Sequence, residues 1–109
     1  LLETEVIAHQ YTAYRVLAAE MAGEPPGPEV SVLKIRGAEV QQGLCEAIAE
    51  AAGQVALIQP ASAASQPGPW ADDPWLHAAT HYFDRRKISI YGGSSEIQKN
   101  IISRRILKI

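Results

Sequence analysis

A cluster of helix-breaking residues, Gly23 with Pro25, Pro26 and Pro28, divides the first half of the sequence into two segments. Proline lacks the amide hydrogen that a helix interior needs, and glycine loses the most backbone entropy, so a helix is not expected to run through this cluster. The segment before it, residues 2–22, predicts an amphipathic helix, because its apolar side chains recur at three- and four-residue spacing. These are Ile7, Tyr11, Tyr14, Ala18 and Met21.

The segment after the cluster predicts a second helix, from Pro28 or Glu29 to Ala52, with Gly53 as the left-handed residue that follows it. Its apolar and small positions have heptad-like spacing: Val30, Leu33, Gly37, Val40, Leu44, Ala47 and Ala51. One face is rich in small residues that allow a second helix to come close, as antiparallel packing requires. These are Gly37, Ala38, Gly43, Ala47 and Ala51.

The second half of the chain predicts two shorter helices. Residues 54–74 are rich in proline, serine and alanine and predict a long loop. A third helix is expected from about Pro74 to Phe83 or Arg85, with Asp73 as its cap, and an extended segment over residues 87–91. A fourth helix follows the glycines, with its apolar side formed by Ile97, Ile101, Ile102, Ile106 and Leu107.

Composition excludes several classes of protein. The chain has 109 residues and a formal net charge of −2, typical of one ordinary globular domain, and it carries no apolar run long enough to span a membrane. The absence of a leader sequence favours a piece of a longer cytoplasmic protein. Cys45 is the single cysteine, and His77 and His81 lack a third ligand, so no metal site is predicted.

The C-terminal segment is basic, with seven bases against two acids from Phe83 onward. It lacks the aromatic-interleaved basic stripe of nucleic-acid-binding proteins, so no nucleic-acid partner is predicted. Its bases suit an anionic small ligand, a partner subunit or a solvated helix face.

The run Ile90-Tyr91-Gly92-Gly93-Ser94-Ser95-Glu96 is the candidate functional site. Two glycines let a ligand approach the backbone, and the positive end of the following helix suits an anionic group. The same residues also predict a well-capped turn, because Ser95 and Gln98 have capping-box spacing and Glu96 complements the helix dipole. Both interpretations stay open on the residues alone.

The sequence from Ile90 to Leu107 resembles the C-terminal signature of the acyl-CoA dehydrogenase family. The similarity extends upstream to Tyr82 and, more loosely, over the first two helices, where Ser31-Val32-Leu33-Lys34 is similar to the family's second bundle helix. It implies an all-α, up-and-down four-helix bundle. Residues 1–109 would form a single C-terminal domain, without the N-terminal helical and middle β domains of the whole flavoprotein.

The resemblance also implies an activity. Acyl-CoA dehydrogenases oxidise an acyl-CoA thioester to the trans-2-enoyl-CoA: a carboxylate removes the α-proton, a hydride passes to FAD, and the electrons go on to an electron-transfer flavoprotein. The family commonly forms tetramers, so a homo- or heterotetramer is expected. The cofactor-binding residues implied here are Gly93, Ser94, Ser95 and Glu96.

The chain departs from the family pattern at Gly92, where many members carry the glutamate that acts as catalytic base. Glu96 is not assigned that role, because it lies inside the helix and competes as a first-turn cap. The family's Gln-x-x-Gly-Gly motif appears only as Glu50-Ala51-Ala52-Gly53-Gln54. The isolated chain is therefore expected to be inactive, and the catalytic residue stays unknown. The alternative function is a non-catalytic structural or oligomerisation domain of a heteromeric complex.

Overall fold

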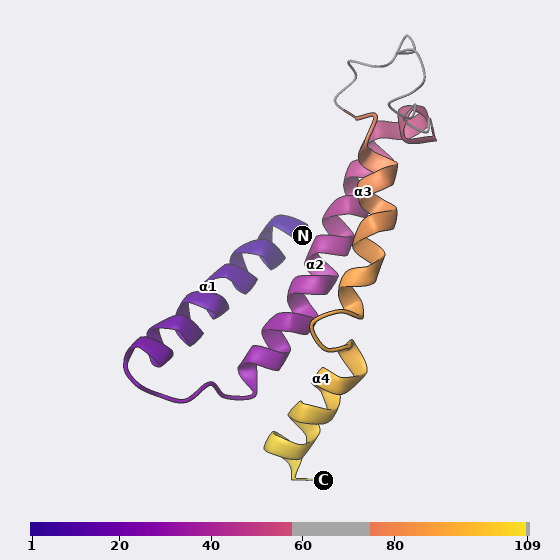
Figure 1. The fold of residues 1–109 in the computed structure, drawn as a ribbon. Helices are drawn as coiled ribbons and strands as arrows, with labels where there is room; N and C mark the ends of the chain where they lie inside the picture. Colours follow the sequence, from indigo (N-terminus) through magenta and orange to yellow (C-terminus); the bar gives the residue numbers. More distant parts are fainter. Residues whose placement is uncertain (58–74, 109) are drawn as a thin grey trace. The chain divides into compact units, whose positions relative to one another are not determined.

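The chain is all-α, as predicted, in a computed structural model that describes residues 1–57 and 75–108. The described residues form four α-helices (Figure 1), which is consistent with a helical bundle: α1 (Leu2–Met21), α2 (Glu29–Ala52), α3 (Ala78–Asp84) and α4 (Ser95–Ile102). Short helical turns follow three of them: η1 (Gly53–Leu57), η2 (Arg85–Ser89) and η3 (Ser103–Leu107). None of the described helices is long and apolar enough to cross a membrane.

The predicted ends of α1 and α2 are confirmed. Gly23 lies directly after the α1 cap with a φ of +84°, and Gly53 follows α2 with a φ of +56°. Both values are in the left-handed region that glycine adopts without steric cost. Local chemistry therefore sets the length of both long helices.

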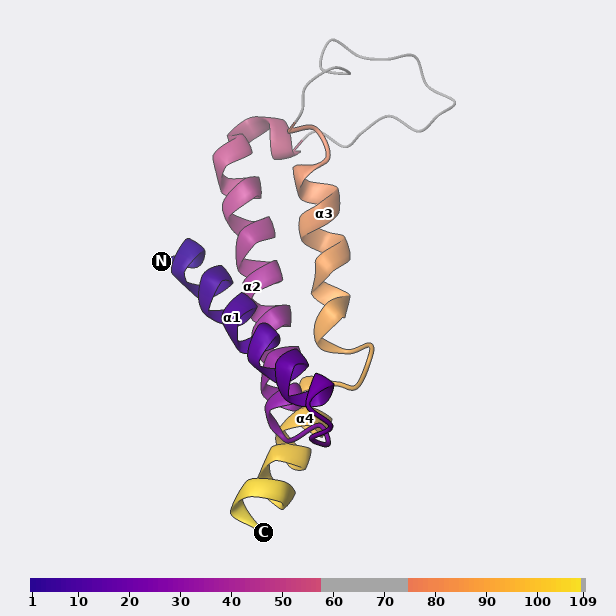
Figure 2. The ribbon, with the colours of Figure 1, turned by 90° about the vertical axis from the view of Figure 1, so that its left-hand side faces the viewer.

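The chain divides into two compact parts. The first comprises residues 1–41 and those from 87 onward, and it contains α1, the start of α2, and α4. Within it the chain reverses direction between α1 and α2 (Figure 2). Ala38 and Val40 of α2 are buried there, and Gly37 lies against His9 of α1. The predicted close approach at a small residue is thus confirmed at Gly37.

The apolar stripe predicted on α1 does not face the protein interior in the described structure. Its large members, Ile7, Tyr11, Tyr14 and Met21, are all exposed, and the exposed fraction of Met21 is 82%. The half-buried face contains Val6, His9 and Val16 instead, among others. Periodicity identifies an amphipathic helix, but it does not identify which element covers the apolar face.

The second compact part comprises residues 42–86. The end of α2 runs alongside α3 (Figures 1 and 2), and the side-chain amide of Gln42 donates to the carbonyls of Arg85 and Arg86, each at 3.3 Å. Leu76 and Ala78 are buried in this part, together with Ala56 of η1.

Two predictions for this region need correction. The third α-helix begins at Ala78, after a turn, and not near Pro74; Asp73, Pro74 and most of the predicted loop lie outside the described residues. The described start of that loop is the 3-10 helix η1.

The segment predicted as extended, residues 87–91, begins within the 3-10 helix η2 and continues as a turn. The alternation of Ile88 and Ile90 does indicate opposite environments, since Ile88 is buried and Ile90 is exposed. No strand is available in the described chain to pair with it, so the backbone forms local hydrogen bonds instead.

Candidate functional site

The predicted glycine turn joins η2 to α4 and presents bare backbone to solvent. Gly92 and Gly93 have φ values of +69° and +91°, so two consecutive residues adopt backbone conformations that side chains disfavour. A Cβ atom placed on Gly92 would have no other atom within 4 Å. The outer side of the turn is therefore open to a ligand.

Ser94 caps the helix that follows the turn. It has an extended backbone, and its hydroxyl accepts a hydrogen bond from the amide of Ile97 at 3.4 Å. The predicted capping box of Ser95 with Gln98 is wrong by one position, because Ser95 is already the first helical residue. The hydroxyl of Ser95 donates to the carbonyl of Ser89 at 3.4 Å.

Gln98 closes the turn from inside α4. Its side-chain amide donates to the carbonyl of Gly92 at 3.5 Å, and its nitrogen lies 2.5 Å from where a Cβ of Gly93 would stand. Gly93 therefore has two reasons to be glycine: its backbone conformation and the space that Gln98 occupies.

Glu96 lies in the first turn of α4, as predicted, and it is exposed. A hydrogen bond from its own backbone amide, followed by one from the Ser94 hydroxyl, lowers the pKa of the Glu96 carboxyl below its usual value. The carboxylate thus complements the positive end of the helix dipole. The helix start is already partly neutralised by the protein's own charge.

The family of the chain follows from a comparison with protein-family models. The model of the acyl-CoA dehydrogenase C-terminal domain matches residues 1–107. The chain belongs to the acyl-CoA dehydrogenase family. No curated protein and no solved structure gives a significant match to it.

The turn of this acyl-CoA dehydrogenase domain suits contact with FAD, which the family typically binds. The open side of Gly92 and the exposed backbone allow a flat ring or a ribose to approach closely.

Position 92, where the resemblance leads us to expect a catalytic glutamate in many family members, holds a glycine. Gly92 has no side chain, and hydrogen bonds from its own backbone amide and from the Ser94 hydroxyl lower the pKa of the exposed Glu96 carboxyl. A lowered pKa also makes Glu96 a weaker base than an ordinary glutamate.

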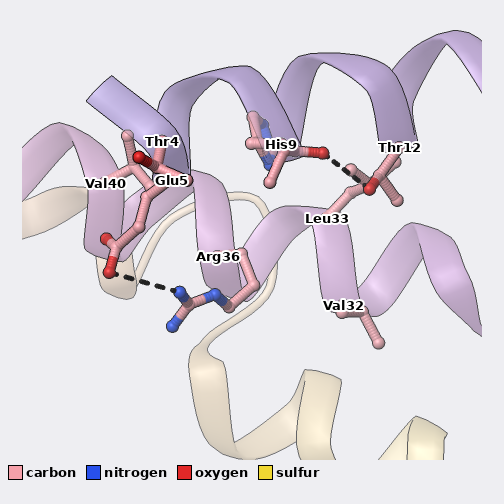
Figure 3. A pocket seen from close by; sticks show the side chains of 9 residues that line it. Thr4, Glu5, His9, Thr12, Val32, Leu33, Arg36 and Val40 are labelled. Carbon is pink, nitrogen blue, oxygen red and sulfur yellow. Dashed lines mark hydrogen bonds and ion pairs between the residues drawn. The ribbon is translucent and has the colours of Figure 1, made fainter. Parts of the chain in front are cut away.

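A hollow lies between α1 and the first half of α2 (Figure 3). Its volume is about 210 Å³, and His9, Thr12, Leu33 and Arg36 are among its lining residues. The Nδ1 atom of His9 is buried and has no hydrogen-bond partner in the described part of the chain. Arg36 pairs with Glu5 across the two helices at 3.9 Å. The sequence patterns did not predict this hollow, since it depends on how two separate helices face each other.

The two histidines at four-residue spacing, His77 and His81, are both exposed. Among the described residues, no three histidine, cysteine, aspartate or glutamate side chains are placed to hold a metal ion.

In the basic C-terminal segment, Arg105 donates to the carbonyl of Pro26 at 3.4 Å. At least this arginine makes a contact within the protein.

Proposed function

We propose that this chain is the single C-terminal domain of an FAD-dependent acyl-CoA dehydrogenase, with N-terminal helical and middle β domains in the whole protein. The substrate is an acyl-CoA thioester, the product is the trans-2-enoyl-CoA, and an electron-transfer flavoprotein is the electron acceptor. The whole protein is a cytoplasmic homo- or heterotetramer. The family match over residues 1–107 carries this proposal.

Gly93, Ser94, Ser95 and Glu96 are proposed to contact FAD. When bound, FAD supplies the acceptor for the substrate hydride. The two glycines keep side chains away from the cofactor, while Ser94 and Glu96 fix the first turn of α4. The contribution of this chain is thus placement and electrostatics.

The proton acceptor is proposed to lie outside this chain, elsewhere in the whole protein or on a partner subunit. Gly92 has no side chain, and Glu96 is engaged at the helix start. The chain by itself is accordingly inactive. Dehydrogenation in the whole protein requires a carboxylate elsewhere, within hydrogen-bond reach of the substrate α-proton.

A reductive titration of the purified full-length protein tests this function. A panel of acyl-CoA thioesters is added under anaerobic conditions, and the visible absorption of the flavin is followed. Bleaching by one member of the panel establishes dehydrogenation and identifies the acyl class. Bound flavin that no thioester reduces contradicts the enzymatic proposal.

A non-catalytic role in a heteromeric complex is the second candidate, favoured by Gly92. For that role, the full-length protein should remain colourless after incubation with FAD. It should also co-purify with a related subunit that carries the flavin. Flavin retained by this protein alone would exclude the purely structural role.

A further inference from the structure

The segment before the glycine turn is linked to α2 by one lysine. Lys34 lies in α2, 54 positions before Ile88 in the sequence, and its ammonium donates to the Ile88 carbonyl at 2.6 Å. Ile88 itself is a core residue, with an exposed fraction of 7%. The contact therefore joins a long helix to a buried point four residues before Gly92.

The hydrogen bond from Lys34 to the Ile88 carbonyl is charge-assisted. Its donor carries a full charge, and charge-assisted hydrogen bonds are shorter and stronger than neutral ones. Lys34 is partly buried, and no carboxylate of the described chain pairs with it. Partial burial of an ammonium is unfavourable unless it is hydrogen-bonded, so the Ile88 carbonyl is the group that compensates it.

Further hydrogen bonds connect this point to the turn and to α4. The amide of Tyr91 donates to the carbonyl of Lys87 at 3.3 Å, which fixes the backbone on both sides of Ile88. Ser95 then bonds back to Ser89, and Gln98 bonds to Gly92. The turn and the start of α4 thus form one hydrogen-bonded unit, which Lys34 ties to α2.

We propose that Lys34 is a positioning residue for cofactor binding: its bond to the Ile88 carbonyl fixes where residues 92–96 present their backbone to FAD. This inference rests on the proposed function, because FAD is the ligand of the turn in that proposal. The inference assigns a role in cofactor binding to a residue that is distant in sequence from the glycine turn. Lys34 acts through the backbone and does not itself contact FAD.

The test compares Lys34→Met with Arg36→Met in the full-length protein. Both changes remove one positive charge from α2, but Arg36 is half exposed and pairs with Glu5 and Glu39. FAD affinity is measured by titrating the flavin-free protein, and hydrogen exchange is measured over residues 88–96 without FAD. Lys34→Met should weaken FAD binding about tenfold and speed exchange in this segment, whereas Arg36→Met should change neither.

Two further variants separate positioning from folding. Lys34→Arg keeps a charged donor and should restore most of the affinity. Lys34→Gln has a shorter, uncharged polar side chain and replaces Lys34→Met if that protein does not fold. It should likewise weaken FAD binding and speed exchange over residues 88–96. The visible circular dichroism of bound flavin should also change in the weakened variant, because the turn holds the cofactor differently.

The outcomes distinguish the two proposals. If the wild-type protein binds no FAD, the proposed function fails. Equal hydrogen exchange over residues 88–96 in Lys34→Met and Arg36→Met would then also show that the bond from Lys34 to the Ile88 carbonyl does not fix this segment. If the wild-type binds FAD and Lys34→Met binds it equally well, the positioning role is overturned even if exchange is faster. A lower melting temperature with unchanged FAD affinity has the same meaning, because it indicates a structural role only.

Discussion

Gly37 and His9 lie directly opposite each other where α1 meets α2. A Cβ atom on Gly37 would stand 3.1 Å from both Cε1 and Nε2 of the His9 ring, which is closer than ordinary contact. Glycine inside a helix normally costs roughly 0.5–1 kcal/mol relative to alanine. At this position glycine is favoured despite that cost, because the His9 imidazole occupies the space that the methyl group of alanine would need.

A double-mutant cycle on this pair should therefore be non-additive. In the wild-type background, we expect Gly37→Ala to give no gain in thermal stability, because the methyl group must displace the imidazole. In the His9→Ala background, the same change should stabilise the full-length protein by about 0.5–1 kcal/mol. Identical effects of Gly37→Ala in the two backgrounds, measured by thermal unfolding, would show that the ring does not restrict this position.

The pH dependence of α4 should follow Glu96. Its pKa in the folded protein is below the ordinary value of 4.5, so the charged form stabilises the fold. This stabilisation is fully present above pH 4.5 and is lost as the pH falls through the lowered pKa. NMR titration of the Glu96 carboxyl should show that Ser94→Ala moves its pKa back toward 4.5, because a hydrogen bond to the charged form is removed.

Glu96→Gln is the matched control for this titration. It keeps the shape of the side chain but should remove the contribution of residue 96 to the acid-dependent loss of stability. An unchanged Glu96 pKa in Ser94→Ala would contradict the hydrogen bond between these two residues.

The two glycines of the turn should differ in their tolerance of alanine. Gly92→Ala should cost about 1–2 kcal/mol, since only the left-handed backbone opposes it. Gly93→Ala should cost more, because its Cβ also meets the side chain of Gln98. Combining Gly93→Ala with Gln98→Ala should recover the steric part, so that the double variant is more stable than the sum of the single effects predicts. Thermal unfolding of the full-length variants measures these differences.

The exposed face of α1 should make the isolated chain self-associate. Tyr11 and Tyr14 pack edge to face, with ring centroids 6.3 Å apart, and are 67% and 56% exposed. Contiguous apolar surface of this kind promotes association. Light scattering after size-exclusion chromatography should show a concentration-dependent mass for the chain produced alone.

Tyr11→Lys should reduce this association, because it places a charge on the apolar face. Gln10→Lys adds the same charge at the neighbouring exposed position and should leave the mass unchanged. A monomer at every concentration, or equal effects of the two lysines, would contradict the role of this face.

Features governed by residues close together in the sequence were predictable. The ends of α1 and α2 follow from Gly23, Pro28 and Gly53, because each acts on its own backbone. The helix cap was displaced by one residue, since Ser94 and Ser95 are chemically equivalent and only the backbone conformation selects the cap. The two glycines before an amphipathic helix identified the turn as a candidate site, and the resemblance to the family added FAD as its expected ligand, but neither revealed the hydrogen bonds of the turn.

Features that join distant residues were not predictable from periodicity. The bond from Lys34 to the Ile88 carbonyl spans 54 positions and uses a main-chain acceptor that no side-chain pattern reveals. The exposed stripe of α1 shows the same limit, because an amphipathic pattern does not specify the partner of its apolar face.

The left-handed backbone of Gly92 limits which residues can stand at this point of the turn. A glutamate at position 92 would place a long side chain at a φ of +69°, a conformation that residues other than glycine rarely adopt. A carboxylate could therefore be introduced here only together with a remodelled turn.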